Sequence, residues 1–329
     1  MPNRAILVTG AAGFIGFHVA RTLLVEGRRV VGLDNLNDYY DPSLKQARLD
    51  VLRASKGFEF VQADLTDRTA IAASFAKHRF ATVIHLAAQA GVRHSIDNPQ
   101  ACADANLEGF LNILEGCRYN GCSHLLYASS SSVYGANTKQ PFAVGDPTDH
   151  PVSLYAATKK ANEVMAYCYS HLYRLPMTGL RFFTIYGPWG RPDMAYFLFT
   201  KAIIEGRPIK LFNHGRMRRD FSYVDDVARV VSLLIDRPPR RGEPGGDPPA
   251  RIYNVGNNHP EELSRMVTLL EEALGRTAVK EMLPMQAGDV IETFADISDL
   301  MRDIGFVPRT PFDEGIRRFV SWYRGHYGI

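Results

Sequence analysis

The sequence has few cysteines, and none of them suggests a covalent staple. Its 329 residues include four cysteines, and no two form a Cys-x-x-Cys pair. That number is too small for a disulfide scaffold, so we expect reduced, packed thiols. The four residues are Cys102, Cys117, Cys122 and Cys168.

The histidines also lack a pattern typical of a metal site. His85 lies inside the apolar strand pattern Val83–Ala87 and is interpreted as a satisfied sheet residue. His94 and His124 have no ligand-like spacing to another histidine or cysteine. We therefore expect no metal.

Long apolar runs and clustered charge are missing too. No stretch approaches the ~18 apolar residues of a membrane-spanning helix, and the run Ala5–Val8 is too short for a secretory signal. The formal net charge is +3 with dispersed basic residues, unlike the clustered basic surface that nucleic-acid binding requires. A small anionic ligand is compatible with this charge. We expect a soluble, cytoplasmic protein without nucleic-acid or membrane partners.

What the sequence does contain is a regular alternation of strand and helix patterns. The composition, 46% hydrophobic and 22% charged, is ordinary for a globular protein. Strands separated by helical segments predict right-handed βαβ crossovers and a doubly wound parallel sheet, the Rossmann type of α/β fold. The strands are expected at residues 5–9, 29–34, 58–64, 82–87, 124–129 and 178–184, with one more at 251–255.

The length allows about two domains of ~100–200 residues each. After about residue 185 the alternation loosens, and the Pro- and Gly-rich segment 237–249 predicts a solvated loop. We expect a dinucleotide-binding domain formed by residues 1–184 and a returning segment 221–258. A smaller C-terminal α/β substrate domain would comprise residues 185–220 and 259–329.

A glycine-rich turn follows the first predicted strand. Gly10, Gly13 and Gly16 precede a helix whose apolar residues, Val19 and Leu23 among them, recur at helical spacing. This order places backbone N–H groups and the positive end of the helix dipole where a pyrophosphate would bind. The spacing is G-x-x-G-x-x-G rather than G-x-G-x-x-G. A tight turn that merely needs glycine conformations is the alternative interpretation.

An acidic residue closes the second predicted strand. Asp34 stands where a carboxylate accepts hydrogen bonds from an adenosine ribose and repels a 2′-phosphate. No Arg or Lys lies between Asp34 and Lys45, which favours NAD over NADP. Asp64 is a candidate for the adenine amino group or a surface turn residue. Asn106, inside a helical pattern, is a candidate support for the strands around the cofactor.

The pair Tyr155 and Lys159 is the most informative motif. Residues four apart share a helix face, so both side chains point the same way from the predicted helix 153–173. Moving a tyrosine pKa from ~10 to near 7 requires about 4 kcal/mol. One lysine at ~6 Å with an effective dielectric of ~20 supplies roughly 2.8 kcal/mol. The remainder would come from an oxidised nicotinamide ring, so the pair predicts proton transfer beside a bound dinucleotide. The alternative is an exposed helix with a core tyrosine.

A run of serines leaves the fifth predicted strand at its carboxyl end, the side on which open α/β sheets bind ligands. One hydroxyl of Ser129–Ser132 is a candidate for passing a proton between a sugar hydroxyl and Tyr155. The others are interpreted as turn-capping groups.

At this point the chain resembles the extended short-chain dehydrogenase/reductase family of nucleotide-sugar enzymes over essentially its whole length. Within that family it is similar to epimerases that act on UDP-glucuronate. The similarity rests on the segments Ser129–Gly135, Leu154–Lys159, Arg181–Met194 and Arg219–Asp226. The resemblance implies retained NAD, hydride removal from C4 of the sugar, a rotating 4-keto intermediate, and hydride return to the opposite face. It also implies a homodimer, with Met165, Tyr169 and Leu172 as a candidate apolar seam. The alternative is that these three residues belong to the core.

The resemblance also assigns site residues. Ser130, four positions before the Tyr of Val-Tyr-Gly, would assist the catalytic Tyr155 and Lys159. The cofactor site is expected to comprise Gly10, Gly13, Phe14, Ile15, Gly16, Asp34, Asn35, Asp64, Leu65, Ala87, Asn106, Tyr155 and Lys159. On the substrate side, Arg219 would bind the UDP diphosphate, Asp289 the uridine ribose, and Phe212 would flank uracil. The alternatives are a surface ion-pair partner for Arg219 and a core aromatic for Phe212.

The sugar itself is addressed by a further set of side chains. UDP-galactose epimerases of the family carry Asn at Thr184 and Arg at Gln286, so their specificity does not transfer simply. Arg191 offers a bidentate partner for a sugar carboxylate, and Arg93 is a second basic candidate. Thr184 with Ser131 or Ser132 offers neutral donors that hold charge on the carboxylate, which opposes loss of CO₂ from a 4-keto uronate.

Three alternatives remain open at this stage. A UDP-glucose/galactose 4-epimerase and a UDP-glucuronate decarboxylase belong to the same family, although decarboxylases usually carry an acid within the segment here occupied by Ser131 and Ser132. A non-catalytic NAD-binding scaffold is the alternative from another class, since fold alone does not establish activity.

Overall fold

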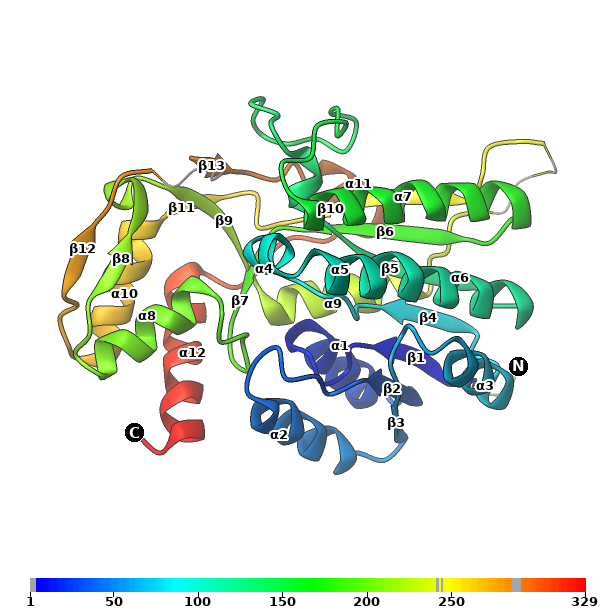
Figure 1. Cartoon of the computed structure of the whole chain (residues 1–329), viewed down its shortest axis with the longest axis horizontal. Helices are drawn as coiled ribbons and strands as arrows, with labels where there is room; N and C mark the ends of the chain where they lie inside the picture. Colours follow the sequence, from blue (N-terminus) through cyan, green and yellow to red (C-terminus); the bar gives the residue numbers. More distant parts are fainter. Residues whose placement is uncertain (1–3, 241–242, 244, 286–290) are drawn as a thin grey trace. The chain divides into compact units, whose positions relative to one another are not determined.

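The computed structural model describes residues 4–240, 243, 245–285 and 291–329. The chain divides into two compact units. The first comprises Met1–Thr138, Val144–Phe182 and Ala228–Asn254; the second comprises Lys139–Ala143, Phe183–Val227 and Val255–Ile329. Relative to the expected boundaries, residues 139–143, 183–184, 221–227 and 255–258 fall in the second unit instead of the first. Figure 1 labels the elements of both units along the chain.

The first unit is built on a parallel sheet that, among the described residues, has seven strands in the order β10-β6-β5-β4-β1-β2-β3. The strands are β1 (Ile6–Thr9), β2 (Val30–Asp34), β3 (Phe58–Gln62), β4 (Thr82–His85), β5 (His124–Ser130), β6 (Met177–Phe182) and β10 (Ala250–Val255). Each lies within two residues of its expected bounds. The predicted doubly wound α/β fold is confirmed.

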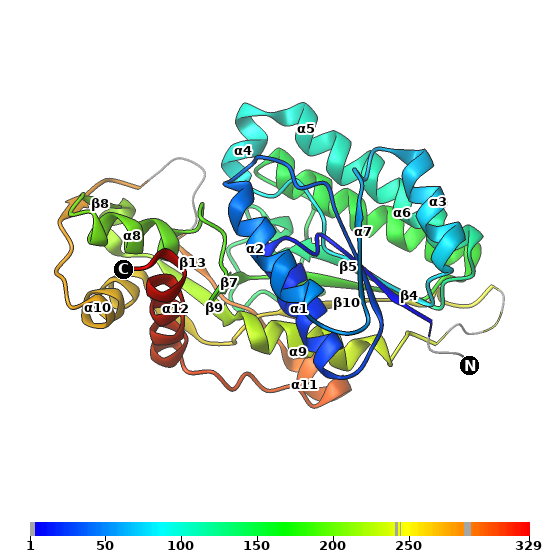
Figure 2. The ribbon, with the colours of Figure 1, turned by 90° about the horizontal axis from the view of Figure 1, so that it is seen from below.

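Helices cover both faces of this sheet, and in Figure 2 α6 and α7 lie on one side while α1 and α9 lie on the other. Val19 and Leu23 of α1 are fully buried, as the helical spacing predicts, and Gly27 with φ of 78° follows the helix. The helices are α1 (Phe14–Val25), α2 (Pro42–Arg53), α3 (Arg68–His78), α4 (Val92–Asp97), α5 (Pro99–Ala103), α6 (Gly109–Tyr119), α7 (Leu154–Tyr173) and α9 (Val224–Ile235), of which residues 224–227 fall in the second unit. A π-helical segment, Asp104–Glu108, joins α5 to α6.

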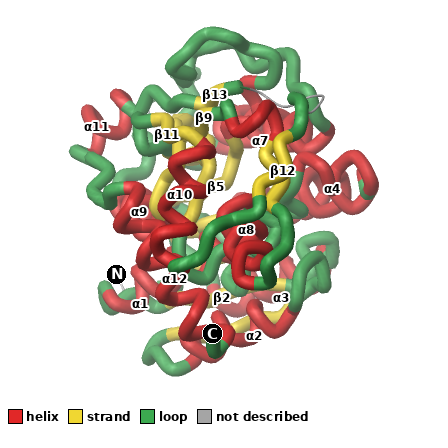
Figure 3. The backbone as a smooth tube through the Cα atoms, turned by 90° about the vertical axis from the view of Figure 1, so that its left-hand side faces the viewer, coloured by secondary structure: helices red, strands yellow, loops and turns green. Residues whose placement is uncertain are grey.

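The second unit contains shorter strands and an aromatic core. In its main sheet β9 pairs with β7, β11 and β13, and β8 pairs with β12 in a separate two-stranded sheet. Figure 3 shows α8, α10 and α12 beside these strands. Its elements are β7 (Thr184–Tyr186), α8 (Ala195–Ile204), β8 (Ile209–Leu211), β9 (Arg218–Tyr223), β11 (Pro260–Glu262), α10 (Leu263–Leu274), β12 (Lys280–Met282), β13 (Glu292–Thr293), α11 (Ser298–Ile304) and α12 (Phe312–Tyr327).

The two tryptophans of the chain meet in this second unit. The rings of Trp189 and Trp322 have centroids 5.3 Å apart, and Trp322 also stacks on His326. Trp189 has a φ of 60°, an unusual conformation for a bulky residue. The contact therefore ties the loop after β7 to the C-terminal helix α12.

One expectation about the thiols is wrong. All four cysteines, each within the described ranges, are free, and Cys102, Cys117 and Cys122 are buried as expected. Cys168 is exposed, because it lies on the face of α7 that points away from the core of its unit. Within the described residues, no helix is long and apolar enough to cross a membrane.

Candidate active site

The glycine-rich turn joins β1 to α1. Gly10 has a φ of 71°, and a Cβ atom there would lie 2.8 Å from the Ala87 nitrogen. A Cβ atom at Gly16 would lie 2.0 Å from the Gly10 carbonyl oxygen. The turn itself thus requires these two glycines. Gly13 is different, because its φ of −77° suits any residue and its Cβ would lie 3.0 Å from the nearest atom, the Gly10 oxygen.

Gly13 is also the N-cap of α1, and no side chain in the described part of the chain caps that helix start. The first amides of α1, which begins at Phe14 and continues through Ile15, therefore point outward with the positive end of the helix dipole. A helix start of this kind fits the pyrophosphate of a dinucleotide.

Asp34 ends β2 beside this turn and is buried. One of its carboxylate oxygens accepts a hydrogen bond from the Ala12 amide at 3.1 Å, and the other accepts one from the Leu36 amide at 2.9 Å. A carboxylate has about four lone-pair sites. Asp34 therefore keeps acceptor capacity for the two ribose hydroxyls of NAD while it braces the glycine turn.

Two buried cations on α2, neither of them a predicted site residue, interact with this region: Lys45 with Asp34 and Arg48 with the glycine turn. Lys45 donates to the carbonyl oxygen of Asn37 at 2.7 Å and to its side-chain oxygen at 2.6 Å. Burial lowers the pKa of Lys45, and the charge of Asp34 opposes this effect. Arg48 donates to the Ala12 carbonyl oxygen in the glycine turn at 2.8 Å. The signal for Arg48 was a basic residue on the apolar face of a helix.

The loop after β3 carries the next predicted cofactor residues. Asp64 accepts from the Asn35 amide group at 2.7 Å and from the Thr66 amide at 2.9 Å. Partial burial would raise the pKa of Asp64, but these hydrogen bonds lower it. Leu65, the next residue, is buried. The acid is thus ionised and joined to the strand that carries Asp34, and its contact with adenine stays a prediction.

Asn106 lies in the π-helical segment and is buried. It accepts from the Gln89 amide at 2.9 Å and donates to the Gln89 carbonyl oxygen at 3.1 Å and to the Thr158 hydroxyl at 3.1 Å. It therefore ties the loop after β4, where Ala87 lies, to α7. Extra turns of this π type occur often at functional sites.

Helix α7 begins at an N-cap, Ser153, whose hydroxyl accepts from the Ala156 amide at 3.1 Å. Tyr155 is half-buried, and its amide donates to the Ser95 hydroxyl at 3.2 Å. Lys159 is buried one turn further along and donates to the Ala128 carbonyl oxygen in β5 at 3.0 Å. Burial lowers the pKa of Lys159 to about 8. The amine is therefore mostly charged at neutral pH.

The serine run at the end of β5 contains groups with different partners. Ser129 donates to a Glu163 carboxylate oxygen at 2.6 Å, which makes it structural. Ser130 accepts from the Ser132 amide at 3.1 Å and donates to the Ser132 hydroxyl at 3.1 Å. Ser131 and Ser132 are half-buried. The proton-relay candidates are thereby reduced to Ser130, Ser131 and Ser132.

The partner of Ser129 belongs to a buried ion pair that sequence reasoning missed. Arg181 in β6 contacts Glu163 in α7 through two hydrogen bonds, at 2.8 and 2.9 Å. Burial opposes the charge of Arg181, but the bonds to Glu163 raise its pKa above the usual value. The two residues are 18 positions apart in different elements, so no local sequence pattern predicts the pair.

Two buried histidines of this unit have structural partners. His85 is buried in β4, bonds through Nδ1 to the Thr9 hydroxyl at 2.9 Å, and has its pKa lowered to about 3 by burial and by the charge of Lys159. His124 is buried between the Ile235 carbonyl and the Thr178 hydroxyl. In the described residues no three His, Cys, Asp or Glu side chains gather as metal ligands do.

The remaining predicted substrate residues are distributed over both units. Arg93 is exposed on α4 of the first unit. In the second unit Thr184 begins β7, Phe212 follows β8, and Arg219 in β9 donates to the Ile291 carbonyl oxygen at 3.1 Å. Asp289 and Gln286 lie outside the described residues.

Arg191, predicted to receive a sugar carboxylate, already has a carboxylate partner. Its guanidinium donates to both oxygens of Asp193, at 2.9 and 2.7 Å. The pair is partly exposed, which keeps it accessible to solvent. A substrate carboxylate would have to compete with Asp193.

Asp220, next to Arg219, is fully buried and was not predicted. Its carboxylate accepts from the backbone amides of Asn257, Asn258 and Ala295. Burial raises its pKa to about 6, although these three hydrogen bonds favour the ionised form. Asp220 thus holds the strand that carries Arg219 to two loops of its own unit.

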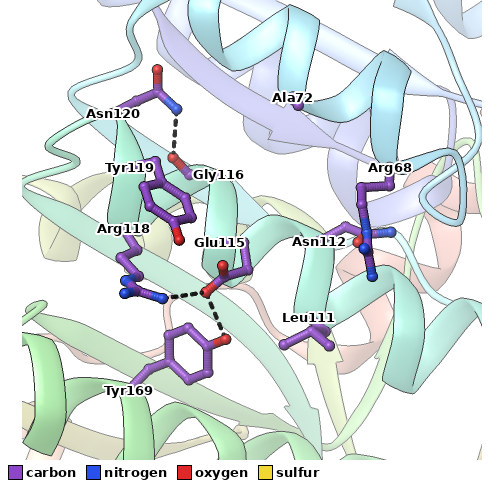
Figure 4. A pocket seen from close by; sticks show the side chains of 10 residues that line it. All are labelled: Arg68, Ala72, Leu111, Asn112, Glu115, Gly116, Arg118, Tyr119, Asn120 and Tyr169. Carbon is purple, nitrogen blue, oxygen red and sulfur yellow. Dashed lines mark hydrogen bonds and ion pairs between the residues drawn. The ribbon is translucent and has the colours of Figure 1, made fainter.

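A surface hollow of about 460 Å³ lies between α3, α6 and α7, away from these groups. Figure 4 shows Glu115 at its centre, bonded to Tyr169 and paired with Arg118. No predicted site residue is among the described side chains that line it. The hollow is therefore not the dinucleotide site.

Residues 6–256 match the NAD dependent epimerase/dehydratase family. The chain belongs to this family. Membership confirms the predicted resemblance to nucleotide-sugar epimerases, the expected NAD dependence, and the expected enzyme class. The glycine turn, the uncapped helix start and Asp34 are the residues that would hold the dinucleotide.

The chain is also similar to individual relatives over nearly its full length. It is 57% identical to an uncharacterized 37.6 kDa protein in the cld 5′ region of Escherichia coli O111:H−, covering 98% of this chain and 99% of that protein. It is 50% identical to a probable UDP-glucuronate 4-epimerase of Rhizobium meliloti, covering 98% and 97%. The structure of the Bacillus cereus UDP-glucuronic acid 4-epimerase with UDP-glucuronic acid and NAD is similar with a TM-score of 0.89, at 30% identity and 98% and 100% coverage.

Proposed function

We propose that this protein catalyses the NAD-dependent 4-epimerisation of UDP-glucuronate to UDP-galacturonate. The relatives named for this reaction support the proposal. The observation that carries it lies in the first unit, where Lys159 of α7 bonds to Ala128 at the end of β5, one residue before the serine run begins. Tyr155 shares the face of α7 with Lys159.

In this mechanism Tyr155 removes the proton of the C4 hydroxyl, and Ser130 relays it between the sugar and the phenol. Charged Lys159 lowers the free energy of the phenolate, and its bond to Ala128 limits the positions that the amine can take. NAD, when bound, supplies the acceptor and donor of the C4 hydride. The 4-keto sugar would rotate before it is reduced on its other face, and Tyr155 would return the proton to the C4 oxygen.

The substrate residues form the second part of the proposal. We assign Arg219 to the diphosphate, Phe212 to uracil and Asp289 to the uridine ribose. Arg93 and Arg191 are assigned to the uronate carboxylate. Arg191 must then replace its hydrogen bonds to Asp193 by hydrogen bonds to the substrate. Thr184, Ser131 and Ser132 are assigned to neutral hydrogen bonds that keep charge on the carboxylate.

A direct assay tests the proposal. The purified protein is incubated separately with UDP-glucuronate, UDP-galactose and UDP-xylose without added NAD, and each product is identified. Conversion of UDP-glucuronate to UDP-galacturonate is expected. Turnover of UDP-galactose alone would identify a galactose epimerase, release of CO₂ as the main outcome would identify a decarboxylase, and bound NAD without any turnover would favour a scaffold.

We also propose that the protein is a homodimer that uses the outer face of α7. Val164, Tyr167 and Leu172 are exposed along it by 59%, 57% and 59%. Of the seam expected from the sequence, Leu172 is on this face, whereas Met165 and Tyr169 pack against the core of the first unit. Replacing Val164 and Leu172 together by Lys should yield monomers in light scattering.

The cytoplasmic location stays a prediction.

A further inference from the structure

The ion pair of Glu163 and Arg181 is a buried polar feature of the first unit that the proposed reaction leaves without a role. The side chains of Glu163 and Arg181 are 3% and 4% exposed, and two guanidinium nitrogens donate to the two carboxylate oxygens at 2.8 and 2.9 Å. Such a pair contributes little net stability, because removing both charges from water costs about as much as their attraction returns. The role of this ion pair therefore lies in its contacts with other groups.

Those contacts reach both ends of the catalytic hydroxyl run. Glu163 accepts from Ser129 at 2.6 Å, immediately before Ser130. Arg181 donates to the phenol oxygen of Tyr134 at 3.0 Å, at the end of the 3₁₀ turn Ser131–Tyr134. The segment that carries the relay hydroxyls is thus anchored before and after by one ion pair.

The ion pair of Glu163 and Arg181 anchors the serine segment, and further hydrogen bonds extend this anchor from Tyr134 and Arg181. The phenol of Tyr134 donates to the Asn254 side chain in β10 at 2.6 Å, and Arg181 also donates to the Val144 carbonyl oxygen at 3.0 Å. These groups lie in the first unit. A guanidinium with several fixed donors can serve Glu163, Tyr134 and Val144 at once, which a lysine ammonium at the end of a flexible stem does poorly.

Helix α7 connects the same anchor to the acid–base pair. Tyr155, Lys159 and Glu163 follow at intervals of four residues and so share one face. Lys159 bonds to Ala128 and Glu163 bonds to Ser129, so two successive residues of β5 are fixed to two successive turns of α7. The next residue of β5 is Ser130.

We propose that Glu163 and Arg181 are positioning residues that hold Ser130–Ser132 at a fixed distance from Tyr155. The proposal rests on the proposed epimerase function. Catalysis by proton relay depends on geometry, and a displacement of ~1 Å costs roughly 100-fold in rate. Loss of the pair should therefore lower kcat without weakening the binding of UDP-glucuronate or the retention of NAD.

The main test uses Glu163→Gln, which keeps the size of the side chain and removes its charge. We expect kcat to fall by roughly 10- to 100-fold while KM for UDP-glucuronate and the NAD content per chain stay within about twofold of wild type. Ser129→Ala should give a smaller fall. The double variant should be no slower than Glu163→Gln alone, because the two residues act through one anchor.

A matched control separates positioning from stability. Leu114→Ala removes a fully buried side chain of α6 in the same unit and lowers the melting temperature without touching the anchor. At a temperature where both variants are folded by circular dichroism, we expect Leu114→Ala to keep wild-type kcat per NAD-loaded chain. Arg181→Lys should not restore the rate that Arg181→Met loses.

The outcomes are distinct. If wild-type protein does not epimerise UDP-glucuronate, the proposed function fails. If wild type is active and Glu163→Gln keeps its kcat, or if Leu114→Ala loses as much kcat at the same melting temperature, the positioning role is refuted.

Discussion

The amide of Ala12 donates a hydrogen bond to the carboxylate of Asp34 at 3.1 Å, which joins the glycine turn after β1 to the acid at the end of β2. The same acid orients the turn, and we propose that its remaining lone pairs accept hydrogen bonds from a ribose. Turn shape and cofactor affinity would then be coupled through one side chain.

Replacing Asp34 by Asn should reduce the NAD content of the purified protein. The amide can still accept from Ala12, but a hydrogen bond from a ribose hydroxyl to a charged acceptor is worth about 1.5–3 kcal/mol. We expect NAD affinity to fall roughly 10- to 100-fold. The measurement is the amount of NAD released on denaturation, followed by titration with added NAD. Unchanged content and affinity would mean that Asp34 serves only the turn.

Replacing Tyr155 by Phe should remove the acid–base group and spare the fold. The Tyr155 backbone amide keeps its bond to Ser95, so α7 should begin as in wild type. We expect kcat to fall by roughly 10²- to 10⁴-fold with UDP-glucuronate still bound. Rates are followed by separating the two UDP-sugars. Wild-type turnover by this variant would end the mechanism proposed above.

Lys159 should give stability a specific pH dependence. Its pKa in the folded protein is about 8, lowered by burial from 10.5, so between these values the unfolded chain binds the proton more strongly. Raising the pH through this interval therefore stabilises the folded state, by up to about 3 kcal/mol. Lys159→Met lacks this term.

Urea unfolding of wild type and Lys159→Met at equal cofactor content checks the sign. The unfolding free energy of wild type minus that of Lys159→Met should increase between pH 8 and pH 10 and stay constant between pH 6 and pH 7. A pH-independent difference would show that the buried amine keeps its ordinary pKa.

Replacing Thr184 by Val should alter the product ratio. Val fits the first position of β7 as well as Thr, because both are β-branched, and the pairing with Phe221 uses the backbone. Loss of one hydroxyl bond of about 1 kcal/mol to the carboxylate should raise release of UDP-4-keto-pentose about fivefold relative to epimer. Ser123→Ala, an exposed serine bonded to Ala81, is the control. An unchanged ratio would leave Thr184 without this role.

The first unit could be predicted closely because its signals are local. Buried parallel strands appear as short apolar runs, and the turn at Gly10 and the pair Tyr155 and Lys159 depend on neighbours in sequence. The pair of Glu163 and Arg181 depends on contacts between separate elements, so spacing gives no signal for it. Helix α7 carries apolar residues on two faces, and periodicity alone does not distinguish Met165, which packs inward, from Leu172, which is exposed.

The second unit was predicted less well for a physical reason. Its strands have two to six residues, for example β13 with two, which is too short for an alternating pattern to emerge. The role of Asp220 depends on backbone amides contributed by residues 257, 258 and 295, which no motif connects in sequence.

The contact between Trp189 and Trp322 gives the second unit a built-in optical label. Since the sequence has no further tryptophan, selective excitation of indole produces emission from this unit alone, while the sheet that carries the glycine turn contributes only tyrosine. Emission and far-ultraviolet dichroism recorded during one denaturation would therefore reveal whether the two halves of the chain melt together or in sequence.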